Sequence, residues 1–129
     1  MRDSRGIKSL IRSFYYAGRG LKWVLASQRN MRIHLLLTAV ALGAAAWFGI
    51  STLELALVFF AIALVTVAEM INSAVEKAVD LVTADFHPLA GMAKDAAAGA
   101  VLLAAFFSVI IGLLVFFPYV KKWLLDIIF

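Results

Sequence analysis

The stretch Ala96–Val120, AAAGAVLLAAFFSVIIGLLVFFPYV, contains no charged side chain. A helix needs about 20 predominantly apolar residues to cross the hydrocarbon core of a bilayer, so this stretch predicts a transmembrane helix. Ile33–Ile50 is a second apolar run of sufficient length. Leu55–Ala68 is a third, and it qualifies when its helical pattern is followed on to Asp80. We therefore predict three membrane-spanning helices.

The composition supports the same class of protein. The 129 residues are 64% hydrophobic and 16% charged, whereas ordinary soluble domains are about 45–50% apolar and about 25% charged. A soluble fold of this size would have to expose much of that apolar excess to water, which excludes this class. The chain has no cysteine, which excludes disulfides, thiolate metal sites and cysteine nucleophiles. We predict one integral-membrane domain over residues 1–129.

The first quarter of the chain is strongly basic. It holds eight of the twelve basic residues and one acid, Asp3; the eight are Arg2, Arg5, Lys8, Arg12, Arg19, Lys22, Arg29 and Arg32. Apolar residues recur among them at three- and four-residue spacing, at Ile7, Leu10, Ile11, Phe14, Leu21 and Val24. A basic face opposite an apolar face favours a helix lying in the membrane interface, over about 5–27, rather than a nucleic-acid-binding segment.

The expected layout follows from these runs. Transmembrane helices are expected over 30–50, 54–82 and 88–120, with turns at Ser51–Glu54 and at Asp85–Pro88. Pro88 suits the first turn of the last helix. Because lysine and arginine concentrate on the cytoplasmic side, the N-terminus and the 81–95 region should be cytoplasmic, and the other turn and the C-terminus external.

The second span carries an unusual polar stripe. At 100° per residue, Glu69, Asn72, Glu76 and Asp80 fall within about 80° of arc and extend over about 16 Å. Carboxylates at membrane depth are costly and by default indicate function. Lys94-Asp95 opens the third span at a similar level, so we predict a polar cluster open to cytoplasmic water.

Two kinds of chemistry fit such a cluster. Several carboxylates with an amide favour a hard cation such as Mg²⁺, a lysine beside the metal suits phosphate oxygens, and a remaining carboxylate can act as general base. That set describes phosphoryl transfer, although the sequence has no GxxxxGK[ST] phosphate loop. The alternative is a small oligomeric proton- or cation-coupled carrier in which Glu69 takes up and releases a proton.

Two motifs decide between these alternatives by resemblance. Residues 69–80, ExxNSAxExxxD, followed by 87–102, HxxxxxAKDxxxxAVL, closely resemble the bacterial integral-membrane diacylglycerol kinase family over nearly the whole chain. Residues 29–34, RNMRIH, look more like the branch that phosphorylates undecaprenol. The resemblance implies a homotrimeric lipid kinase of the bacterial inner membrane. It also implies MgATP as phosphoryl donor and active sites formed between subunits.

The resemblance also implies residue roles. Glu69 would be the base on the lipid hydroxyl, Asn72 would support the site, Glu76 would bind Mg²⁺ and Lys94 would contact the phosphates. The remaining nucleotide-contacting positions are Tyr16, Asp80, Asp85, His87 and Asp95. Gln28 departs from the family pattern, because many relatives carry a metal-binding Glu there. Its amide oxygen can still ligate Mg²⁺ but brings no charge.

Overall fold

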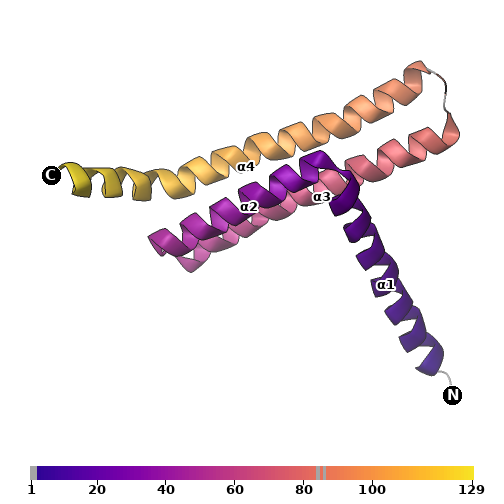
Figure 1. Cartoon of the computed structure of the whole chain (residues 1–129), viewed down its shortest axis with the longest axis horizontal. Helices are drawn as coiled ribbons and strands as arrows, with labels where there is room; N and C mark the ends of the chain where they lie inside the picture. The colour runs from indigo at the N-terminus through magenta and orange to yellow at the C-terminus, as the bar shows by residue number, and fades with distance from the viewer. Residues whose placement is uncertain (1–2, 84, 86) are drawn as a thin grey trace.

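The computed structural model describes residues 3–83, 85 and 87–129. Arg2, the side chain of Arg5, and Phe86 of the second turn lie outside this description. The described chain forms four helices: α1 (Asp3–Ser27), α2 (Arg29–Phe48), α3 (Thr52–Val82) and α4 (Pro88–Ile128). The last three are long and apolar enough to cross a membrane, which confirms the expected all-α fold with three candidate spans. They run alongside one another, whereas α1 leaves them at a steep angle (Figure 1).

The three candidate spans differ in length, and this difference positions the site. At 1.5 Å per residue, the 20 residues of α2 extend about 30 Å, which matches the hydrocarbon core of a bilayer. The 31 residues of α3 extend about 46 Å, and the 41 residues of α4 about 61 Å. Consequently α3 and α4 continue together past the start of α2, toward the turn that joins them (Figure 1).

The turn between α2 and α3 is built from standard helix-end chemistry. Gly49 ends α2 with φ 61° and ψ 46°, a left-handed conformation that glycine adopts without the strain of a Cβ. Ser51 then caps α3: its hydroxyl accepts a hydrogen bond from the Glu54 backbone N–H, and the Glu54 carboxylate accepts one from the Ser51 N–H. This reciprocal capping box makes the reversal short.

The opposite end of α4 is tied to the same turn. Tyr119 donates a 2.6 Å hydrogen bond from Oη to Glu54 Oε2, and its ring lies 6.0 Å from that of Phe48. Beyond this contact α4 runs on to Ile128, past the expected end at position 120. The sequence-based boundary marked the end of the uncharged run, but lysines at that point do not interrupt helical hydrogen bonding. Pro118 lies within the helix.

The core lies along α3, which packs most extensively against α4 and then against α2. Small and β-branched side chains fill this seam, and Ser108 of α4 donates a 3.0 Å hydrogen bond to the Ala61 carbonyl of α3. The buried apolar residues on α3 and α4 are Val58, Ala61, Val65, Ala104 and Val115. The three buried polar residues of the described chain are Glu69, Asn72 and Ser73, all in the second half of α3.

Candidate functional site

The polar face of α3 begins inside the bundle. The Glu69 and Asn72 side chains are 2% and 7% exposed, so both are buried by the chain itself. Asn72 Nδ2 donates a 3.2 Å hydrogen bond to Glu76 Oε1 one turn further on. This contact follows from the four-residue spacing, which places successive side chains on one side of a helix. The residues of the predicted stripe therefore lie on one side of α3. Glu69 and Asn72 are buried, whereas Glu76 is half-buried and Asp80 is exposed to solvent.

Two oxygen atoms in this face are buried without a partner. Glu69 Oε2 and Asn72 Oδ1 accept no hydrogen bond from any described residue. Buried polar atoms are nearly always satisfied in folded proteins, and leaving one unmade costs about 1–3 kcal/mol. Both atoms are hydrogen-bond acceptors, so a donor or a cation would satisfy them.

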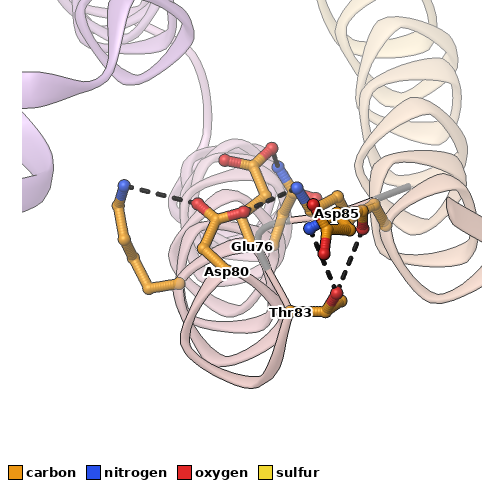
Figure 2. Close-up of polar contacts among 7 residues, drawn as sticks. Glu76, Asp80, Thr83 and Asp85 are labelled. Atoms are coloured by element: carbon orange, nitrogen blue, oxygen red, sulfur yellow. Dashed lines mark hydrogen bonds and ion pairs between the residues drawn. The ribbon is translucent and has the colours of Figure 1, made fainter. Parts of the chain in front are cut away.

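The face continues to an ion pair between α3 and α4. Lys94 Nζ lies 2.6 Å from Asp80 Oδ1, which joins residues fourteen positions apart across the turn. Lys77, one turn before Asp80, approaches the other carboxylate oxygen at 3.7 Å. Figure 2 shows Glu76 and Asp80 on the same side of α3, with Thr83 and Asp85 where the helix ends. The predicted meeting of this stripe with the start of α4 is present in the structure.

The turn between α3 and α4 shapes a cleft around this ion pair. The Thr83 hydroxyl both accepts from the Asp85 N–H at 3.2 Å and donates to the Asp85 carbonyl at 3.1 Å (Figure 2). His87 caps α4, with its Nδ1 accepting from the Leu89 N–H at 3.3 Å. The cleft has a volume of about 500 Å³ and is lined by Val79, Asp80, Thr83, Asp85, His87, Ala90, Gly91 and Lys94.

The cleft thus gathers four of the residues expected to contact nucleotide: Asp80, Asp85, His87 and Lys94. It does not gather the others. Tyr16 is 61% exposed on α1, where its ring packs edge-on against Tyr15, and Asp95 is exposed at the start of α4. Gln28 is half-buried at the junction of α1 and α2. It occupies the position before α2, but its side chain makes no capping hydrogen bond.

Two residues of this region were missed by the sequence analysis. Thr83 holds the turn by its hydroxyl, which a threonine just after a helix can do but which no spacing rule singles out. Lys77 precedes Asp80 by three residues, a separation that permits an ion pair on a helix. Its second contact, with the Trp23 ring of α1 at 5.8 Å, depends on how two helices meet and has no local signal.

Comparison with known proteins gives this site a family. The model of the prokaryotic diacylglycerol kinase family matches residues 15–116. The chain belongs to this family. It is 39% identical to the undecaprenol kinase of Bacillus subtilis over 87% of this chain and 91% of that protein. It is 42% identical to the diacylglycerol kinase of a Synechocystis species over 81% of this chain and 60% of that protein, and 29% identical to that of Escherichia coli over 84% and 88%.

Family membership makes the chain a lipid kinase, and kinases use ATP as co-substrate, typically with a divalent metal. In the cleft, the Lys94 ammonium lies among the Asp80 and Asp85 carboxylates and the His87 ring. Among the described residues, no group of three or more histidine or acidic side chains could hold a metal ion.

Proposed function

We propose that this lipid kinase transfers a phosphoryl group from ATP to the hydroxyl of a membrane lipid alcohol, undecaprenol or diacylglycerol, at the cytoplasmic face. One observation carries the proposal: a single face of α3 runs from the buried, unpartnered carboxylate oxygen of Glu69 to the solvent-open cleft at Asp80 and Lys94. A reaction between a lipid and a water-soluble nucleotide needs a protein surface with one end in the bilayer and the other end in water.

The depths of these residues fit the two substrates. Counted from Thr52 along α3, Glu69 lies about 26 Å and Asp80 about 42 Å from the outer end. The hydrocarbon core is about 30 Å thick. Glu69 therefore sits just inside the inner edge of the hydrocarbon, where the hydroxyl of a lipid alcohol resides, and Asp80 sits in water.

The chemistry assigned to each side chain follows from these surroundings. The Glu69 carboxylate takes the proton from the lipid hydroxyl as the hydroxyl oxygen attacks the terminal phosphorus of ATP. The bond between this phosphorus and the bridging oxygen breaks, and ADP leaves with the electron pair. Lys94 contacts phosphate oxygens as a point charge, and Asn72 holds Glu76 through their hydrogen bond. Glu76 and Gln28 would hold Mg²⁺ together with the phosphates, and the metal would neutralise charge that develops on them.

The membrane arrangement is part of the proposal. The apolar stripe of α1 is open to its surroundings, with Ile7, Leu10, Ile11 and Phe14 all more than half exposed. Together with the steep departure of α1 from the bundle (Figure 1), this supports an amphipathic helix lying in the cytoplasmic interface of the bacterial inner membrane. The N-terminus is then cytoplasmic, as the basic residues of α1 require.

A homotrimer with shared sites completes the proposal. Neither Tyr16 nor Asp95 lines the cleft of a single chain. Neighbouring copies can supply these groups and can enclose the polar face from lipid. We propose three copies, the number that the resemblance to the family implies.

Radiolabelled ATP tests the proposal with purified protein in nanodiscs. With Mg²⁺ and either undecaprenol or diacylglycerol, the label should appear in the organic extract, and the preferred acceptor is the one with the higher kcat/KM. The same protein in liposomes should leave an imposed proton gradient intact. Gradient dissipation without lipid labelling would instead support the carrier alternative.

A further inference from the structure

The Asp80–Lys94 pair poses a problem for the proposed nucleotide site, on which this inference rests. Lys94 Nζ is already held 2.6 Å from Asp80 Oδ1. When Lys94 turns toward a phosphate, the Asp80 carboxylate loses its closest cation while still lining the same cleft. An uncompensated carboxylate beside phosphate oxygens weakens binding by like-charge repulsion. A second cation that can reach Asp80 would remove this cost.

Lys77 is placed to be that cation. Its Nζ lies 3.7 Å from Asp80 Oδ2. Lys94 contacts the other carboxylate oxygen, Oδ1, at 2.6 Å. The Lys77 and Asp80 side chains are 59% and 48% exposed, so neither is fixed by packing. Asp80 therefore has a close partner on α4 and a looser one on its own helix, and it can shift between them without leaving the cleft.

Trp23 keeps Lys77 within reach. The Lys77 ammonium lies 5.8 Å from the centre of the Trp23 ring, within the range of a cation–π interaction. Trp23 belongs to α1, so the contact joins that helix to the edge of the cleft. Its neighbour Val24 is buried, which anchors this part of α1 against the other helices.

We propose that Lys77 is a positioning residue that takes over the Asp80 carboxylate when Lys94 engages a nucleotide phosphate, and that Trp23 holds Lys77 ready for this exchange. Asp80 is paired before and after the exchange, and one positive charge is released to the phosphate. The role belongs to nucleotide binding rather than to the transfer step, because Lys77 touches neither Glu69 nor the proposed acceptor region.

Binding of a fluorescent ATP analogue with Mg²⁺, to full-length protein in nanodiscs without lipid acceptor, measures this role directly. Lys77→Met should raise the dissociation constant about two- to fivefold, the range expected for an exposed ion pair. Lys77→Arg should bind like the wild type, and Trp23→Leu should weaken binding less than Lys77→Met does. In turnover, Lys77→Met should raise the KM for ATP and leave kcat nearly unchanged.

A double-mutant cycle separates the exchange from a general charge effect. In an Asp80→Asn background, Lys77→Met should cause no further loss, whereas additive losses would overturn the inference. Lys122→Met, which removes an exposed lysine near the other end of α4, is the matched control, and equal weakening by it would also overturn the inference. If Lys94→Ala leaves nucleotide binding unchanged, the proposed site itself is wrong. If Lys94→Ala weakens binding but Lys77→Met does not, only the role of Lys77 is wrong.

Discussion

Replacing Glu69 by glutamine should abolish activity without destabilising the protein. Loss of a general base lowers kcat by about 10²–10⁴-fold. The Glu69 side chain is 2% exposed and its Oε2 has no hydrogen-bond partner in the described chain. Burying an unpartnered polar atom costs about 1–3 kcal/mol, and more when the group is charged. The amide has the same shape and no charge, so the free energy of unfolding should stay the same or rise by about 1–3 kcal/mol.

Kinetics and thermal unfolding of the same nanodisc preparation measure both quantities. Ser73→Ala is the matched control, since Ser73 is 1% exposed and its hydroxyl donates to the Glu69 carbonyl at 2.9 Å. This control should keep most of the wild-type kcat and lower the Tm only slightly. Two results for Glu69→Gln would exclude Glu69 as the general base: a kcat above one tenth of the wild-type value, or a fall in Tm large enough to explain the lost activity.

Three further predictions concern the metal, the assembly and the core. Gln28→Glu should lower the Mg²⁺ concentration needed for half-maximal activity, and Gln28→Ala should raise it. The underlying change in the free energy of Mg²⁺ binding is about 1–3 kcal/mol. Superimposable Mg²⁺ titrations of the three proteins would exclude Gln28 from the metal site. Inactive Glu76→Gln and Lys94→Ala chains, mixed before reassembly, should regain part of the activity if the two residues act across subunits, and an active monomer would contradict a shared site. Ser108→Ala should cost about 0.5–1.5 kcal/mol in unfolding measurements by removing the hydrogen bond to the Ala61 carbonyl, with kcat unchanged.

The helices were predictable because their signals are local. A bilayer demands long apolar runs, and those runs correspond to α2, α3 and α4. The polar stripe at Glu69, Asn72 and Glu76 was predictable because helical periodicity alone aligns the residues. The predicted span ends at position 120 while α4 continues to Ile128, because hydropathy marks where a helix leaves the apolar environment and not where its hydrogen bonds stop.

Contacts that depend on how helices meet were harder to predict. The Asp80–Lys94 pair could be expected only as proximity, because the turn between α3 and α4 fixes which atoms touch. The contact between Lys77 and Trp23 depends on the path of α1, and the spacing of residues in the sequence does not predict it. The unpartnered oxygen of Glu69 is likewise a property of packing, and no sequence pattern reports it.

Mass spectrometry of the lipid itself is the simplest test of phosphoryl transfer to a membrane alcohol by this protein. Purified protein is incubated with ATP, Mg²⁺ and a membrane containing the lipid alcohol, and the lipid is then extracted and analysed. The proposed function predicts that the alcohol gains one phosphoryl group with the wild-type protein and gains almost none with Glu69→Gln. Recovery of unmodified lipid, with ATP either intact or hydrolysed only to ADP and free phosphate, would contradict it.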